Sequence, residues 1–294
     1  KAPIQIIGGN IKNNFEYVMP IASAQVKSSL MLASLSSGNS IKITEPKITR
    51  DHTERMIEFL DGSIETLELA EGKTIFLQSS NLSKISTYEV VGDFSSAAFI
   101  IVAALISKNS EVLIKNVGLN KTRSGLLEVL LKMNANIEIV NKTKTCNEDC
   151  GDIIVKSSQL EGINVPNSII PNIIDEIPIL SVAASFAEGQ TIIKNASELK
   201  VKESDRLQAT AMGGETMNIK HDLLDDGLII NGTRDDVEIH EEIESFGDHR
   251  IAMSFLIAGL RSKNGVKVRD CSNIETSFPN FTKTMNNLGM NINE

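Results

Sequence analysis

The sequence predicts an α+β fold built from repeated helix–strand units. Four segments share one plan: a polar or acidic entry, a helix of small apolar residues, a short turn and a strand. The predicted strands begin about every 70 to 80 residues, a period too long for a solenoid and consistent with tandem compact subdomains. A length of 294 residues favours about two domains.

The four predicted helices each begin at a residue that is common at helix N-termini. Ser23, Asp93, Asp175 and Asp248 can accept hydrogen bonds from free backbone N–H groups of the first turn. Alanine and serine among larger apolar residues allow close packing, and the nearly apolar circumference predicts burial on all sides. The predicted helices cover residues 23–33, 93–105, 175–185 and 248–260.

Each helix is followed by a run rich in β-branched residues, which predicts a strand. These runs are Ile41 to Thr44, Val112 to Lys115, Thr191 to Lys194 and Val266 to Arg269. A second, amphipathic helix is predicted after three of them, at Asp51 to Leu60, Ser124 to Met133 and Asn280 to Leu288, with a weaker match from Ser204 onward.

The chain opens at Lys1 with an apolar run, Pro3 to Gly9, that predicts a further strand. No signal or transit segment is recognisable there. A start inside a structural element suggests that upstream sequence is absent.

The composition, 41% hydrophobic and 23% charged, is typical of a soluble globular protein. A net charge of -9 argues against general attraction to nucleic acid or a membrane surface. Any site for an anionic ligand must therefore be a local concentration of Arg and Lys. No apolar run reaches about 18 residues, so we expect no transmembrane helix.

Three cysteines, an odd and sparse set, fit a reducing compartment better than a disulfide framework. Cys146 and Cys150 flank a polar stretch, a spacing that could hint at a metal ligand pair. Because no His or second Cys pair lies nearby in the sequence, we expect a surface loop there instead.

Residues 202–206 set two cations and two carboxylates in five consecutive positions, ahead of an apolar-periodic segment. Lys202 and Arg206 are four apart, so at a helix start they would share one face and could bind an anion. Glu203 could then move a proton beside that anion. The alternative is a solvated helix start of mixed charge. Several helix N-termini converging on one place would also bind anions, although each can equally be a well-capped core helix.

Seven short motifs, in this order and spacing, carry a resemblance that runs from Lys1 to the end of the chain: residues 23–28, 50–54, 92–97, 174–180, 201–207, 248–253 and 276–279. The chain resembles the 5-enolpyruvylshikimate-3-phosphate synthase (3-phosphoshikimate 1-carboxyvinyltransferase) family, and within it the bacterial class II branch. Many class I members have Lys where this chain has Thr276, so no phosphate-binding lysine is assigned there.

The resemblance implies an enolpyruvyl transferase-like two-domain fold, an inside-out α/β barrel of six helix–strand subdomains with the active site between the domains. About four of the six repeats are present. Residues 1–91 would be the C-terminal part of the first domain, and residues 92–294 the second domain. The family's earlier substrate-binding motifs are missing, so this piece alone is expected to show little or no turnover.

The implied reaction transfers the enolpyruvyl group of phosphoenolpyruvate to the 5-hydroxyl of shikimate 3-phosphate and releases phosphate. It needs no redox cofactor and no obligatory metal. By resemblance, Asp175 would deprotonate the hydroxyl, Glu203 would shuttle the proton at the methylene carbon, and Lys202 would contact the shikimate hydroxyl. An N-cap role is the alternative for Asp175. In the full-length parent, replacing Asp175 or Arg206 by Ala is expected to lower turnover by orders of magnitude with the fold intact.

The resemblance also implies which residues bind each substrate. Shikimate 3-phosphate would be held by Ser23, Ala24, Gln25, Arg50, Asp175 and Lys202; phosphoenolpyruvate would be held by Gln25, Glu203, Arg206 and Arg250. His52 and His249 lie inside matched motifs, where a structural hydrogen bond is at least as plausible as catalysis. His221 and His240 lie outside the motifs and are expected on the surface.

The implied partners are the two small-molecule substrates, with no nucleic acid or membrane. The full-length enzyme is expected to be a cytoplasmic monomer. The sister enzyme acting on UDP-N-acetylglucosamine is the nearest alternative, although the motif from Lys202 to Arg206 favours the shikimate enzyme. A non-catalytic truncated homologue, with uncovered apolar helix faces that associate with another polypeptide, is a further alternative.

Overall fold

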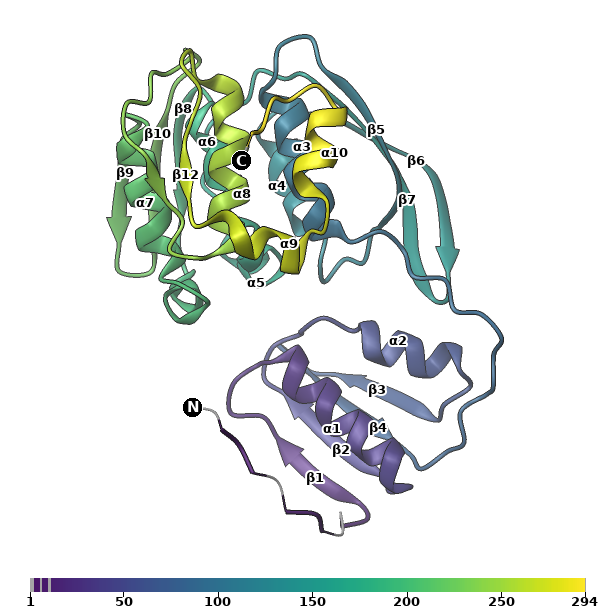
Figure 1. Cartoon of the computed structure of the whole chain (residues 1–294). Coiled ribbons are helices and arrows are strands. Elements are labelled where there is room, and N and C mark those ends of the chain that lie inside the picture. The colour runs from purple at the N-terminus through teal and green to yellow at the C-terminus, as the bar shows by residue number, and fades with distance from the viewer. Residues whose placement is uncertain (1–2, 6, 10–11, 294) are drawn as a thin grey trace. The chain divides into compact units, whose positions relative to one another are not determined.

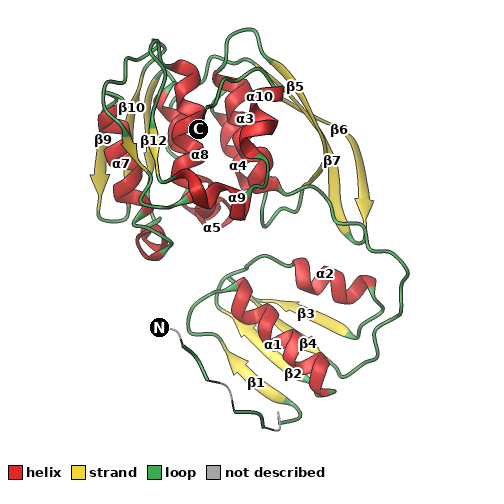
Figure 2. Ribbon diagram, viewed as in Figure 1, coloured by secondary structure: helices red, strands yellow, loops and turns green. Residues whose placement is uncertain are grey.

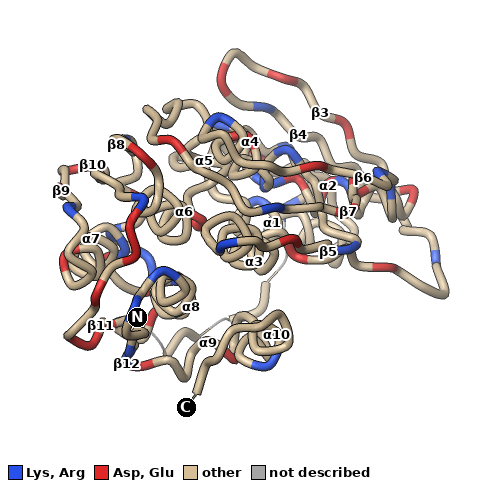
Figure 3. Tube along the Cα trace, turned by 90° about the horizontal axis from the view of Figure 1, so that it is seen from above, with Lys and Arg blue, Asp and Glu red and all other residues tan. Residues whose placement is uncertain are grey.

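The computed structural model describes residues 3–5, 7–9 and 12–293 and divides into two compact units (Figure 1). Unit 1 comprises residues 1–90 and 144–149, and unit 2 comprises residues 91–143 and 150–294. Both signs of charge are interspersed along the trace (Figure 3), in keeping with a modest net charge.

Unit 1 is a four-stranded sheet with two helices. The strand order is β1 (Phe15–Val18), β2 (Ile41–Glu45), β4 (Lys73–Leu77), β3 (Ile64–Glu68). β1 pairs with β2 in parallel, and the other two pairs are antiparallel. The helices are α1 (Ala24–Ser37) and α2 (His52–Phe59). Met31 of α1 and Ile57 of α2 share a core with Ile41 and Ile43 of β2, because alternate β2 side chains point to that face.

Two expectations for unit 1 are wrong. In α1 only Lys27, Met31 and Ser34 are buried, and Val26 and Leu32 are exposed, so its circumference is not covered on all sides. Residues 3–5 and 7–9 are not in a strand, and residue 6 of that predicted strand lies outside the described residues. β1, further along the chain, was not predicted.

The tip of a long hairpin, residues 144–149 between β6 (Asn136–Thr145) and β7 (Glu148–Lys156), belongs to unit 1. There His52 Nδ1 lies 2.7 Å from Glu148 Oε1, and Arg55 donates to the carbonyl of Asn147 at 3.1 Å. His52 therefore has a structural hydrogen bond. Cys150 is buried in β7, which contradicts the predicted surface loop, whereas Cys146 is half-buried in the turn.

Unit 2 places helices inside and strands outside (Figure 2). The central helices α3 (Phe94–Ile106), α6 (Ile177–Ser185) and α8 (His249–Ala258) contact one another pairwise. Most of their residues are buried, as their apolar sequences predicted. A single core therefore surrounds these three helices and extends to the strands.

Three small sheets flank this helical layer. Their strand orders are β5–β7–β6, β8–β10–β9 and β11–β12. The strands not yet given are β5 (Glu111–Gly118), β8 (Gly189–Ile193), β9 (His221–Leu224), β10 (Gly227–Gly232), β11 (Ile243–Glu244) and β12 (Val268–Arg269). The remaining α-helices are α4 (Gly125–Lys132), α5 (Ile170–Ile173), α7 (Arg206–Thr216), α9 (Ile274–Ser277) and α10 (Phe281–Asn287).

Two adjacent glycines let α7 pack closely against its neighbours. A Cβ at Gly213 would lie 2.0 Å from the Phe255 ring of α8, and one at Gly214 would lie 2.0 Å from the His221 ring. His221 is buried, so its predicted surface position is wrong. Burial lowers the pKa of His221, and its Nδ1 lies 2.9 Å from the carbonyl oxygen of Ile219.

Among the described residues, the helical stretch Asn167–Ser185 is long and apolar enough to span a membrane by length and composition alone, although Asp175 and Glu176 interrupt its apolar residues. An 18-residue window within this 19-residue stretch has a mean hydropathy of 1.2. The stretch is 78% buried within the protein and includes α5 and α6 of the unit 2 core. This burial is what the core helix of a globular unit shows.

Candidate active site

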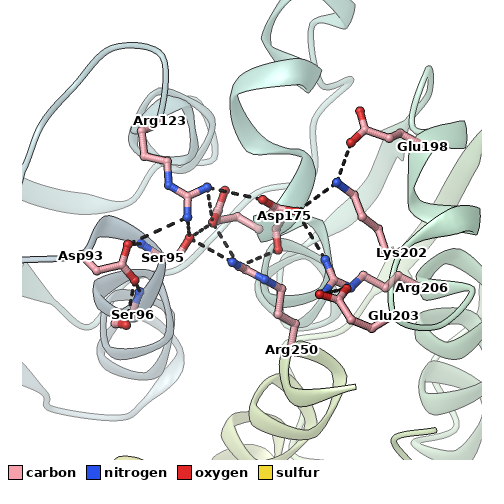
Figure 4. Close-up of polar contacts among 11 residues, drawn as sticks. Asp93, Ser95, Ser96, Arg123, Asp175, Glu198, Lys202, Glu203, Arg206 and Arg250 are labelled. Atoms are coloured by element: carbon pink, nitrogen blue, oxygen red, sulfur yellow. Dashed lines mark hydrogen bonds and ion pairs between the residues drawn. The ribbon is translucent and has the colours of Figure 1, made fainter. Parts of the chain in front are cut away.

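Five of the predicted site residues come together in unit 2 (Figure 4). The Asp175 carboxylate is at their centre: its Oδ1 lies 3.5 Å from Lys202 Nζ and 3.4 Å from Arg206 Nη1. Arg250 Nη1 donates to the Asp175 carbonyl at 3.0 Å, and Glu203 is hydrogen-bonded to Arg206. We call this group, with the neighbours added below, the Asp175 cluster.

Helix caps place these side chains. The carboxylate of Asp205 accepts from Gln208 N at 3.1 Å, so α7 begins at Arg206. The carboxylate of Asp248 accepts from Arg250 N at 2.9 Å at the start of α8. Asp175 differs, because it lies in the 3₁₀ turn Ile174–Glu176 ahead of α6 and does not cap that helix. The alternative reading of Asp175 as an N-cap is therefore wrong.

Arg206 is almost completely buried, at 1% exposure, and each part of its guanidinium faces a carboxylate. Its Nε donates to Asp248 Oδ2 at 2.7 Å, deep in the unit. Burial pushes the pKa of Asp248 upward, but the hydrogen bond and charge of Arg206 outweigh it and hold that pKa below its ordinary value. A ligand that binds Arg206 must displace a carboxylate, and Glu203, at 55% exposure, is the most accessible one.

The structure adds residues that sequence reasoning missed. Arg123 Nη1 lies 3.6 Å from both Asp175 Oδ2 and Glu176 Oε1. Ser95 Oγ accepts from Arg250 Nη2 at 3.3 Å and is also bonded to Arg123 and Glu176. Ser95 and Glu176 lie within matched motifs and could have been found there. Arg123 lies in a turn outside every motif, so no sequence pattern singled it out.

His249 lies next to Arg250 at the start of α8. Burial and then the charge of Arg250 lower the pKa of His249, which favours the neutral ring. His240 is exposed, as predicted. Among the described residues, no group of three or more His, Cys, Asp or Glu side chains is arranged to hold a metal ion.

The remaining predicted residues lie in unit 1. Ser23 caps α1, with its Oγ accepting from Val26 N at 3.3 Å, and Ala24 and Gln25 form the first turn of that helix. Gln25 is exposed and Arg50 is half-buried in the loop before α2. The first turn of α1 therefore has the backbone N–H groups of a helix N-terminus, to which anions are attracted.

Beneath these residues lies a buried quartet of charges: Lys27, Glu45, Glu54 and Lys73. Lys27 Nζ lies 3.2 Å from a Glu45 oxygen and 2.7 Å from a Glu54 oxygen, and Lys73 Nζ lies 3.1 Å from Glu54. No member has a side chain more than 11% exposed. Glu45 also accepts from Thr49 Oγ1 at 2.6 Å, which ties down the loop that precedes Arg50.

The fold and the site indicate a class of protein, and comparison with known proteins then identifies the family. The fold, with helices inside and strands outside, and a cluster of cations around carboxylates fit an enzyme class that binds anionic small molecules. Residues 1–285 match the model of the family EPSP synthase (3-phosphoshikimate 1-carboxyvinyltransferase), where EPSP is 5-enolpyruvylshikimate-3-phosphate. The chain belongs to this family.

Relatives and solved structures agree with this placement. The chain is 41% identical over 293 residues to the 3-phosphoshikimate 1-carboxyvinyltransferase of Magnetococcus marinus, covering 100% of this chain and 65% of that protein. For the Coxiella burnetii protein of the same name, identity is 40% over 290 residues, with 99% and 65% covered. A solved structure of EPSP synthase from Acinetobacter baumannii matches with a TM-score of 0.88 at 39% identity, covering 96% and 64%.

These matches confirm the predicted enolpyruvyl transferase-like fold. The chain spans about two thirds of the length of the curated relatives it matches.

Proposed function

We propose that the protein transfers the enolpyruvyl group of phosphoenolpyruvate to the 5-hydroxyl of shikimate 3-phosphate, with release of phosphate, in the route to aromatic amino acids. The observation that carries the proposal is the Asp175 cluster, where one partly accessible carboxylate faces three cations in a chain of the EPSP synthase family. Anionic substrates need such cations, and the transferred proton needs a carboxylate.

In the proposed mechanism the 5-hydroxyl oxygen adds to the enol carbon of phosphoenolpyruvate. Asp175 takes the hydroxyl proton, and Glu203 delivers a proton to the methylene carbon, giving a tetrahedral ketal. Glu203 then takes a proton back from the new methyl group as the C–O bond to phosphate breaks and the double bond re-forms. Lys202, 3.5 Å from Asp175, contacts the shikimate hydroxyl and offsets the charge that develops there.

The anion-binding roles follow from charge and accessibility. Arg206 and Arg250 bind the carboxylate and phosphate of phosphoenolpyruvate with the planar fork of the guanidinium group, after Glu203 releases Arg206. In unit 1, Ser23, Ala24 and Gln25 at the α1 N-terminus hold the shikimate phosphate, with Gln25 also contacting phosphoenolpyruvate. Arg50 adds positive charge in the same unit.

We further propose that unit 1 corresponds to the C-terminal part of the family's first domain and unit 2 to its second domain. The predicted boundary at residues 91 and 92 lies one residue from the unit boundary, although the hairpin tip, residues 144–149, belongs to unit 1. The same proposal includes that the full-length protein is a cytoplasmic monomer and that its partners are small molecules.

Binding measurements on this chain test the proposal. By titration calorimetry, we expect shikimate 3-phosphate and phosphoenolpyruvate to bind, and UDP-N-acetylglucosamine to bind far more weakly, because the family match favours the shikimate substrate. Asp175→Asn should weaken shikimate 3-phosphate binding, whereas Asp222→Asn, at an exposed ion pair with Lys220, should leave it unchanged. Preference for the UDP-sugar, or no binding of either proposed substrate, would contradict the proposal.

A further inference from the structure

We propose that Arg123 is a positioning residue for Asp175: it fixes the orientation of the Asp175 carboxylate and favours its ionised form. This role rests on the proposed function, in which Asp175 accepts the hydroxyl proton. It also rests on the geometry of unit 2, where Arg123 reaches Asp175 from a different element than Lys202 and Arg206 do (Figure 4).

The turn that carries Arg123 is held by its own hydrogen bonds. Asn120 is buried, and its side-chain oxygen accepts from Thr122 N at 2.9 Å and from Thr122 Oγ1 at 2.7 Å. The Asn120 carbonyl accepts from Arg123 N and from Ser124 N, each at 2.9 Å. The backbone of this turn is therefore fixed just before α4 begins, and the Arg123 side chain starts from a defined place.

The Arg123 side chain is only 12% exposed, and its Nη1 atom is buried. Nη1 lies 3.6 Å from Asp175 Oδ2, while the other oxygen, Oδ1, faces Lys202 and Arg206. Figure 4 shows Arg123 on one side of Asp175 and Lys202 on the other. The carboxylate is thus held by positive charge at both of its oxygens. The nitrogen of Arg123 that faces Asp175 is therefore shielded from solvent, which suits a role exerted through Asp175.

Arg123 is itself held in place. Its Nη2 donates to Ser95 Oγ, which also accepts from Arg250 Nη2 at 3.3 Å. Glu176 Oε1 lies 3.2 Å from Arg250 Nη1 and 3.6 Å from Arg123 Nη1, so this buried carboxylate offsets the repulsion between the two guanidinium groups. The same contacts therefore align Arg123 and Arg250 around Asp175.

Other charged groups also lie close to Asp175. The groups in contact with it are Arg123 before α4, Glu176 beside it, Lys202 after the 3₁₀ turn Ser197–Val201, Arg206 of α7 and Arg250 of α8. The carboxylates that face these cations are Asp93, Glu198, Glu203 and Asp248. Arg123 faces Oδ2 of Asp175, whereas Lys202 and Arg206 face Oδ1.

The test follows the Asp175 carboxyl carbon by NMR over a pH titration of the folded chain. In Arg123→Gln we expect the Asp175 midpoint to move up by about one pH unit, because a neighbouring cation favours the ionised carboxylate. Arg123→Lys keeps the positive charge, so its Asp175 midpoint should lie close to the wild-type value. Arg234→Gln, an exposed arginine paired with Glu188, is the matched control and should leave the midpoint unchanged.

An unchanged Asp175 midpoint in a folded Arg123→Gln chain would overturn the proposal. Should that variant not fold, the wild-type chain provides the same test: the Arg123 guanidinium resonances should shift with the Asp175 midpoint, and their independence would overturn it too. Calorimetry with shikimate 3-phosphate separates the two proposals. If the wild-type chain does not bind it, the proposed function fails, whereas the NMR result still decides the role of Arg123.

Discussion

The buried quartet of unit 1 and the Asp175 cluster of unit 2 are both networks of cations and carboxylates, but they differ in access to solvent. The quartet pairs two lysines with two glutamates, and all four side chains are nearly inaccessible. The Asp175 cluster has a buried inner pair, Arg206 and Asp248, and an accessible edge that includes Glu203. Ligands can exchange with partners at such an edge, whereas they cannot enter the quartet.

This difference separates charges that hold the fold together from charges available for chemistry. Removing one partner of a buried pair leaves an uncompensated charge and costs about 3–5 kcal/mol. Accessible pairs contribute about 0–1 kcal/mol to stability. Variants of the two networks should therefore fall into two groups, one losing stability and the other losing ligand affinity.

The largest effect is expected inside the quartet. Glu45→Ala leaves Lys27 buried with less negative charge around it and should lower the free energy of unfolding of unit 1 by about 3–5 kcal/mol. Urea unfolding, followed by hydrogen exchange of β2 amides, measures this loss. Glu16→Ala, at an exposed pair with Lys42, is the control and should cost less than about 1 kcal/mol. Equal losses of unfolding free energy in the two variants would show that the buried quartet contributes no more to stability than an exposed ion pair.

The inner pair of the Asp175 cluster should behave like the quartet. Arg206→Met leaves Asp248 buried without its counter-charge, and we expect unit 2 to lose about 3 kcal/mol or more in urea unfolding. This changes the expectation from sequence that an Arg206 substitution would leave the fold intact. The double variant Arg206→Met with Asp248→Leu should recover part of the loss, and a double variant no more stable than the single one would argue against the pair.

At the edge of the cluster the effect should be on binding. Lys202→Met removes a charged donor at an accessible position, so shikimate 3-phosphate should bind about tenfold or more weakly, while unfolding changes by less than about 1 kcal/mol. Calorimetry and urea unfolding measure the two quantities. Lys200→Met, two residues away and exposed, serves as the control for a general loss of positive charge. A purely structural Lys202 would show the opposite pattern.

The smallest effect concerns pH and the buried His221. Its folded-state pKa is lowered by burial, so the unfolded chain takes up a proton that the folded chain does not. Stability from this group is present above the unfolded pKa of about 6.5 and falls with decreasing pH by at most about 1.4 kcal/mol per unit. Thermal unfolding from pH 7 to 5 measures the slope. His221→Gln should flatten it, and the exposed His240→Gln should not.

The sequence predicted the helices of unit 2 well because their small and large apolar residues are buried on nearly every side, as in α3 and α6. The same pattern misled for α1, where Val26 and Leu32 are exposed, since composition does not say which neighbours cover a helix. The expectation for His221 failed for a related reason. Only the tertiary contact with Gly214 reveals that its ring is enclosed.

The site was predicted in part. Motifs gave Asp175, Lys202, Glu203, Arg206 and Arg250, and the structure brings all five together in unit 2. Sequence could not show that Arg206 is committed to Asp248, because the two are 42 positions apart. Nor could it find Arg123, whose relation to Asp175 depends on the turn before α4. Such contacts arise only when distant segments pack.

The two adjacent glycines of α7 make a segment without functional side chains intolerant of substitution. Gly213 and Gly214 lie well past Arg206 on the same helix, with no charge and no ligand to contact. A methyl group at Gly213 would collide with the Phe255 ring, and one at Gly214 with the His221 ring, so either would push α7 away from its neighbours. Because Arg206 lies on α7, a displacement of the helix also moves Arg206. In a saturation mutagenesis scan, substitutions at these two glycines should therefore lower stability and ligand binding as strongly as substitutions at the charged positions.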